Sequence, residues 1–137
     1  HQSSHDALLF LTSREIGFSL ANRIYKHYGE FTVDKLTTNP YRMIDEIDGV
    51  GFQTADNLAK HLGIASNDPR RLIAGMMHVL QLETRFGHCG MVIEKLLSQS
   101  ANLLKVARDD LMEMIEILIE EKKVMSETLK DKPCVFM

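Results

Sequence analysis

Apolar residues recur at helical spacing along the first half of the chain. Two stripes follow the pattern i, i+3, i+4, i+7, and these are Ala21, Ile24, Tyr25 and Tyr28, then Ala55, Leu58, Ala59 and Leu62. A glycine follows each stripe, where a left-handed helix cap belongs. A shorter helix is expected before each one, over residues 6–13 and from Pro40 onward, with Asn39 as its N-cap. The pattern therefore predicts helix, tight turn, helix, twice over.

The two helical units are copies of one another. Sliding the sequence by 34 residues places EIGFSLANRIYKHYG (15–29) on GVGFQTADNLAKHLG (49–63). Identical residues meet at Gly17/Gly51, Phe18/Phe52, Ala21/Ala55, Lys26/Lys60, His27/His61 and Gly29/Gly63. Tetratricopeptide repeats share this period, but they need about three copies and carry a Trp/Gly/Tyr signature that is absent here. We therefore favour a tandem helix-hairpin-helix.

The second half follows a different order of elements. A helix is expected from Pro69 to Gly87, then an extended piece over 88–92 and helices over 93–101 and 108–123. Two strands follow, over 124–129 and 134–137, joined by a turn. This is the order of a winged helix. The predicted fold class is therefore mainly α, with a tandem helix-hairpin-helix domain (1–66) followed by a small winged-helix-like domain (67–137) that holds a short antiparallel sheet.

Composition excludes several classes of protein and site, but it does not indicate a function. The chain has 137 residues and a net charge of −3, so as a whole it is not a basic nucleic-acid-binding protein. It contains no apolar run of about 18 residues, and we expect no membrane span. Two cysteines make no disulfide framework, which favours a reducing cytoplasm. The His88–Cys89 pair has no second pair at ligand spacing, so no metal is expected. The start at His1 indicates an excised fragment.

The Gly-x-Gly turns are the candidate binding sites. Such a turn before a helix N-terminus presents several backbone N–H groups at one point, which suits a phosphate without any basic side chain. The main cradle would be Gly49, Val50, Gly51 and Phe52, with Thr54 and Lys60 assisting. The weaker copy, in which Glu15 replaces the first glycine, would be Gly17, Phe18, Ser19 and Lys26. The structural alternative stays open, because the glycines could simply permit a tight turn between helices.

The expected recognition helix of the winged module is acidic. Its carboxylates are Asp109, Asp110, Glu113, Glu116, Glu120 and Glu121. They would meet phosphates with repulsion, where basic proteins gain counterion release. We predict that this helix does not enter DNA. The methionines of this half, Met76, Met112 and Met114, are expected to fill its core.

The residues NPYRMIDEIDGVGFQTADNLAKHLGI, DPRRLIAGMMHVL and GHCGM, in that order, resemble the N-terminal region of the RecD-like helicases. That family is similar to the alpha subunit of exodeoxyribonuclease V, with an added helix-hairpin-helix region. The resemblance implies a parent that is an ATP-dependent 5′–3′ DNA helicase of repair and recombination, with ATP and Mg²⁺ in its motor.

No P-loop exists in these residues, because no glycine is followed by Lys, so the fragment itself is expected to be non-catalytic and to hold no cofactor. The partners implied by the resemblance are DNA, single-stranded or forked, and the helicase motor of the same chain. The alternative is an interaction module that docks the motor or a repair protein without touching DNA.

Overall fold

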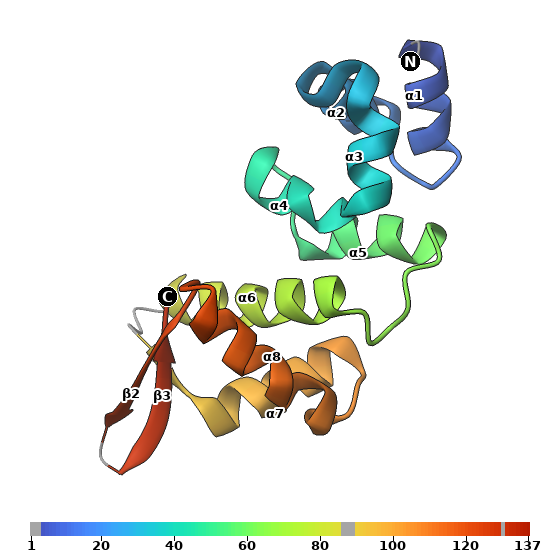
Figure 1. The fold of residues 1–137 in the computed structure, drawn as a ribbon. Coiled ribbons are helices and arrows are strands. Elements are labelled where there is room, and N and C mark those ends of the chain that lie inside the picture. The colour runs from blue at the N-terminus through green and yellow to red at the C-terminus, as the bar shows by residue number, and fades with distance from the viewer. Residues whose placement is uncertain (1–3, 86–89, 130) are drawn as a thin grey trace. The chain divides into compact units, whose positions relative to one another are not determined.

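The chain folds into two compact units, residues 1–65 and 66–137. The computed structural model describes residues 4–85, 90–129 and 131–137 (Figure 1). Helices dominate both units and a small antiparallel sheet belongs to the second, which confirms the predicted fold class. The predicted helix end at Gly87 and the His88–Cys89 pair lie outside the described residues. No helix in the described part is both long and apolar enough to cross a bilayer.

The first unit contains five α-helices among its described residues. They are α1 (Ser4–Thr12), α2 (Phe18–Tyr28), α3 (Thr32–Thr38), α4 (Met43–Glu46) and α5 (Phe52–His61), with 3-10 turns at Gly29–Phe31 and Pro40–Arg42. The sequence pattern missed α3, and the single helix expected from Pro40 is a 3-10 turn followed by α4. Asn39 is the cap as predicted, since its side chain accepts a hydrogen bond from the Tyr41 N–H at 3.0 Å.

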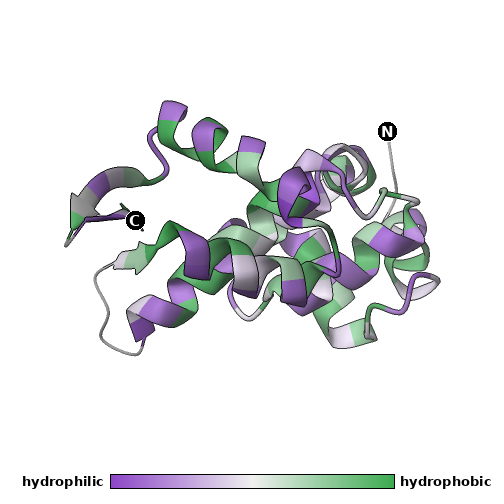
Figure 2. Ribbon diagram, turned by 90° about the horizontal axis from the view of Figure 1, so that it is seen from below, coloured by the Kyte–Doolittle hydropathy of each residue, from purple (hydrophilic) through white to green (hydrophobic). Residues whose placement is uncertain are grey.

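The core of the first unit lies between the apolar faces of its helices. Figure 2 shows the apolar and polar stripes that alternate around these helices. Six of the eight residues in the predicted stripes are buried, and the other two, Tyr25 and Leu62, are half-buried. The largest fully buried side chains of this unit are Leu11, Ile24, Leu36, Met43 and Leu58.

The second unit combines helices with a three-stranded sheet. Its elements are α6 (Pro69–Arg85), β1 (Gly90–Val92), α7 (Ile93–Leu104), α8 (Arg108–Glu120), β2 (Met125–Leu129) and β3 (Lys132–Phe136). The strand order is β1-β3-β2, and both pairings are antiparallel. Leu129 pairs with Lys132, so the turn is shorter than predicted. The element order is the one expected, although the winged-helix assignment stays a prediction.

Close packing of α6 on α7 holds the second unit together. A Cβ at Gly75 of α6 would stand 2.5 Å from a Cδ atom of Leu104, so a larger residue there would require the Leu104 side chain to shift. The Arg71 guanidinium is buried and donates to the carbonyl oxygen of Leu104 at 2.8 Å. Met112 contradicts the prediction that it fills the core, because it is 54% exposed on α8.

Candidate nucleic-acid interface

The first hairpin (residues 4–28) and the second hairpin (residues 40–61) turn through the same unusual backbone conformation. Gly49 has φ +87°, and Glu15, at the equivalent position of the first copy, has φ +67°. For a residue with a side chain, this left-handed region is about 1–2 kcal/mol less favourable than the right-handed one. The first glycine of the Gly-x-Gly motif is therefore explained by the turn itself, and Glu15 adopts that turn at a cost.

The second glycine of the motif is not required by the turn. Gly51 has φ −103° and ψ −177°, an extended conformation that any residue adopts. A Cβ built on it would meet nothing within 4 Å. Gly17, its equivalent, has φ −61° and ψ 151° and the same open space around it. The fold gives no steric reason for glycine at either position.

Each of these glycines caps the N-terminus of a helix. Gly51 precedes α5 and Gly17 precedes α2, and neither helix start has a side-chain cap hydrogen bond from the described residues. The glycine carbonyls accept the first helical bonds, from Ala55 N–H at 3.2 Å and Ala21 N–H at 2.9 Å. Helix starts present N–H groups without intrahelical acceptors and a partial positive charge. Both helix starts are thus suited to an anion.

The residue between the two glycines packs inward. Val50 is buried, as is its equivalent Ile16 in the first hairpin. The Val50 N–H donates to the carbonyl oxygen of Ile47 at 3.3 Å, so it is used within the turn. Val50 therefore fixes the hairpin, and any contact with a ligand falls to the backbone that follows it.

The two phenylalanines that follow the glycines lie in different environments. Phe52 is 3% exposed and stacks on Tyr41, with ring centroids 6.0 Å apart and an interplanar angle of 19°. Phe18 is 66% exposed, and Ala7 stands at the position equivalent to Tyr41. The Phe52 ring is therefore part of the core, and only its backbone could face a ligand.

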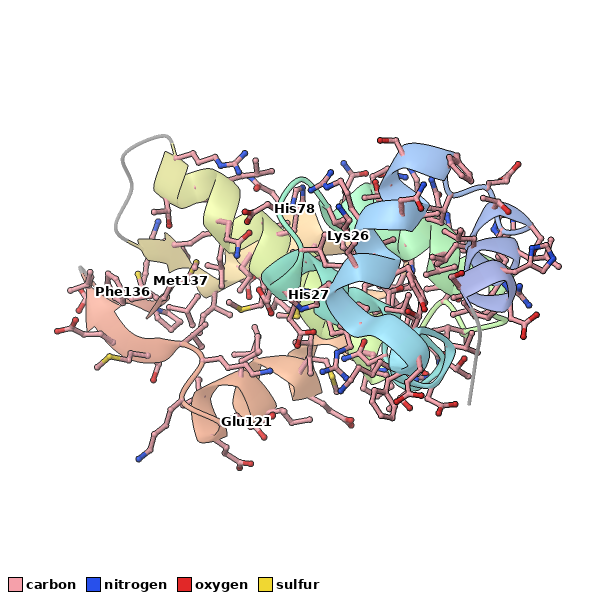
Figure 3. All side chains as sticks on the ribbon, turned by 90° about the horizontal axis from the view of Figure 1, so that it is seen from above. Lys26, His27, His78, Glu121, Phe136 and Met137 are labelled. Carbon is pink, nitrogen blue, oxygen red and sulfur yellow. The ribbon has the colours of Figure 1, made fainter. Side chains whose placement is uncertain are left out.

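The predicted lysines also differ. Lys60 Nζ lies 3.8 Å from Asp56 Oδ2, and the buried Asp56 carboxylate accepts the Tyr41 hydroxyl at 2.6 Å. The Lys60 side chain is therefore exposed, but its ammonium group is paired with the Asp56 carboxylate. Lys26 is exposed on α2, next to His27 (Figure 3).

The two predicted hydroxyl donors lie close to the glycines. Ser19 is exposed in the first turn of α2, and Thr54 is half-buried in the first turn of α5. The structure therefore leaves the Ser19 hydroxyl accessible at the start of the first hairpin's second helix.

Arg23 is a candidate that the sequence pattern missed. Its guanidinium, from α2, donates to the Asp48 carbonyl oxygen and lies 3.3 Å from the place of a Cβ on Gly49. The reciprocal contact is made by His61 of α5, whose Nε2 lies 3.1 Å from Oε2 of Glu15 in the first hairpin turn. Each hairpin turn is therefore contacted by the second helix of the other. The available signal was that Arg23 departs from the repeat, which has Asn57 at that position.

A polar cluster joins the two hairpins. The Tyr28 hydroxyl donates to Glu46 Oε1 at 2.8 Å, and Arg42 Nε donates to the same oxygen at 3.0 Å. Arg42 holds the pKa of the Glu46 carboxyl below its usual value, while burial and then the hydrogen bond to Glu46 raise the pKa of Tyr28. These contacts tie α2 to α4 and so fix the spacing of the two hairpins.

Helix α8 of the second unit has an acidic surface. Asp109, Asp110, Glu113, Glu116 and Glu120 are all exposed on α8. A groove of about 480 Å³ lies between α7, α8 and the β2–β3 strands. Most of its lining residues are apolar, and three are glutamates, Glu94, Glu116 and Glu127. The Arg108 guanidinium pairs with Glu94 at 2.7 Å.

Known proteins match the part of the chain that carries the hairpins. Residues 1–90 match the family described as the ATP-dependent RecD2 DNA helicase HHH domain. A protein of Deinococcus radiodurans named ATP-dependent RecD2 DNA helicase is 42% identical over 69 residues, which are 50% of this chain and 10% of that protein. The chain thus matches only a tenth of its relative's length. Two hairpins of matching geometry and a family match over most of the chain lead to one conclusion: the chain belongs to the family of the RecD2 DNA helicase HHH domain.

Proposed function

We propose that residues 1–65 form a non-catalytic module that holds the sugar-phosphate backbone of DNA through the backbone amides of its hairpins. The observation that carries the proposal is the open space at Gly51, where a side chain would fit yet none is present. A phosphate oxygen must approach a backbone N–H to about 3 Å, and a side chain at this position would obstruct that approach. The family match to a DNA helicase domain supports DNA as the source of the phosphate.

The two roles considered for the Gly-x-Gly motif, a tight turn and the close approach of a phosphate, are then carried by different glycines. Gly49 serves the tight turn, because its φ is +87°. Gly51 serves the approach of the ligand, because its own backbone conformation is ordinary. In the second hairpin the contacting groups are the amides from Gly51 onward, with Thr54 adding a hydroxyl. In the first hairpin they follow Gly17, with Ser19 and Lys26.

The test is a bulky side chain at Gly51. Gly51→Leu should leave the far-ultraviolet circular dichroism unchanged, because the position is extended and open. It should weaken DNA binding at least about tenfold, since a hydrogen bond to a charged group contributes about 1.5–3 kcal/mol. The matched control is Thr37→Leu, which adds an exposed leucine on α3, outside both hairpin turns. A Gly51→Leu protein that is folded and binds DNA like the wild type would refute the proposal.

The parent protein is proposed to be an ATP-dependent 5′–3′ DNA helicase of the cytoplasm that acts in repair or recombination. The names of the family and of the Deinococcus relative support an ATP-dependent DNA helicase. The polarity, the compartment and the pathway rest on the resemblance to the RecD-like helicases. ATP and Mg²⁺ would act in the motor of that parent. The module would hold a single-stranded or forked substrate near the motor.

For residues 66–137 the acidic surface of α8 favours a second role, docking against the motor or another protein. Exposed carboxylates along α8 repel a phosphate backbone, whereas the groove, whose lining includes apolar side chains with Glu116 and Glu127, suits a basic protein segment. Replacing Glu113 and Glu116 with glutamine should leave DNA affinity unchanged or slightly higher. A loss of affinity in that variant would place α8 on the DNA instead.

A further inference from the structure

The helix α2 carries an aromatic and basic stripe that its copy α5 does not present. Phe18, Asn22, Tyr25 and Lys26 fall within about 100° of the helix circumference. Phe18 is 66% exposed, Tyr25 and Asn22 are half-buried, and Lys26 is exposed. The two hairpins therefore share a backbone but differ in the side chains that they offer to a ligand.

Three of the four equivalent positions on α5 lie inside the protein, and the fourth, Lys60, is 60% exposed. Phe52, Asp56 and Ala59 are buried, and Lys60 is paired with Asp56. The two copies differ at the residue 11 positions before the phenylalanine. Tyr41 covers Phe52, whereas the small side chain of Ala7 stands at the equivalent position of the first hairpin. The Phe18 ring therefore stays in solvent at the point where α2 begins.

Resting on the proposed function, we propose that Phe18 stacks on an unpaired nucleobase of single-stranded DNA. Sequence-independent binding of single strands combines aromatic rings, on which bases stack, with cations that follow the backbone. Both kinds of group lie on the stripe of α2. A base inside a duplex already stacks on its neighbours, so an exposed ring of this kind contributes only where the base is unpaired.

The spacing along α2 sets the path of the strand. Phe18 is the first residue of the helix and directly follows Gly17, so a base on the ring lies beside the open helix start. The Asn22 side chain donates to the Phe18 carbonyl oxygen at 3.2 Å. Lys26 is eight residues further on, about 12 Å along the helix axis. A strand that follows α2 would meet the ring first and the Lys26 cation afterwards.

The chain contains a matched control for Phe18. Phe31 is also in the first unit, is 54% exposed, and lies in the 3-10 turn after α2 rather than on the stripe. A general loss of exposed aromatic surface would affect Phe18 and Phe31 variants alike. Stacking on a base at the start of α2 requires Phe18 alone.

The experiment measures fluorescence anisotropy of residues 1–137 with a labelled oligothymidylate and with a duplex of the same length. Phe18→Leu should weaken single-strand binding about tenfold and leave duplex binding unchanged, while Phe18→Trp restores the single-strand affinity. Phe31→Leu should bind like the wild type. With a single 2-aminopurine in the strand, the wild type should quench the base and Phe18→Leu should not.

The outcomes separate this inference from the function on which it rests. Wild-type affinity of Phe18→Leu for the single strand, or an equal loss for single strand and duplex, overturns the stacking. If Gly51→Leu abolishes binding in the same series, the phosphate-holding hairpins survive that result. If the wild type binds no DNA at low salt, both proposals fail together.

Discussion

The two glycines of the second hairpin should respond in opposite directions to the same substitution. Gly49→Ser forces a side chain into φ +87°, and its Cβ would lie 3.3 Å from Arg23 Nη2. Gly51→Ser places the same side chain in an extended, open N-cap position. Serine is among the preferred N-cap residues, so its hydroxyl can accept an N–H of the first turn of α5.

The magnitudes follow from these two environments. At Gly49, the left-handed conformation destabilises the folded serine variant by about 1–2 kcal/mol. The lower conformational entropy of its unfolded chain offsets about 0.4–1 kcal/mol of this loss. The free energy of unfolding should therefore fall by about 1 kcal/mol. At Gly51, the same entropic gain adds to a few tenths of a kcal/mol from the cap, so the free energy of unfolding should rise by about 0.7–1.3 kcal/mol.

Urea denaturation followed by tyrosine fluorescence measures this difference in the first unit alone. The chain has no tryptophan, and its three tyrosines, Tyr25, Tyr28 and Tyr41, all lie within residues 1–65. The free energies of unfolding of the two variants should differ by about 2 kcal/mol, with unchanged dependence on urea concentration. Equal stabilities, or a Gly51→Ser protein that is less stable than Gly49→Ser, would refute the assignment of the turn to Gly49 and the open position to Gly51.

Two further predictions concern the second unit. Gly75→Ala should lower the free energy of unfolding by about 1 kcal/mol. Overpacking against the buried Leu104 costs about 1–3 kcal/mol, which outweighs a helix-propensity gain of about 0.8–1 kcal/mol. Urea unfolding followed by circular dichroism measures this change, and a stabilised variant would contradict it. Burial, and then the charge of Arg85, lowers the pKa of His78, so the unfolded chain takes up the proton first and stability should fall as the pH drops through about 6.5. Thermal unfolding between about pH 7.5 and 5.5 should show a smaller pH dependence in His78→Gln, and an unchanged dependence would exclude His78 as its source.

The internal repeat predicted the parts of the fold that depend on local sequence. Equivalent positions 15 and 49 share a positive φ although one is glutamate and the other glycine. The hydrophobic spacing also placed Ile24 and Leu58 in the core. These features follow from turn geometry and helix periodicity, which neighbouring residues determine.

The parts that the sequence could not predict depend on neighbours far along the chain. Phe18 and Phe52 align in the repeat, yet one is exposed and the other buried: Tyr41 stacks on Phe52, and the repeat has Ala7 where Tyr41 stands. Arg23 reaches the second turn across 25 residues, and no local pattern indicates such a contact. Met112 fits a core spacing but is exposed on α8.

The salt dependence of DNA binding by residues 1–137 tests the central claim most directly. The labelled single strand should bind at about 50 mM salt, and the logarithm of its affinity should fall with the logarithm of salt concentration with a slope of about −0.7 to −2. That shallow slope reflects a backbone held mainly by amides, with few exposed cations such as Lys26 close to the hairpins. Failure to bind at that salt concentration would contradict the claim that the hairpins hold a DNA backbone.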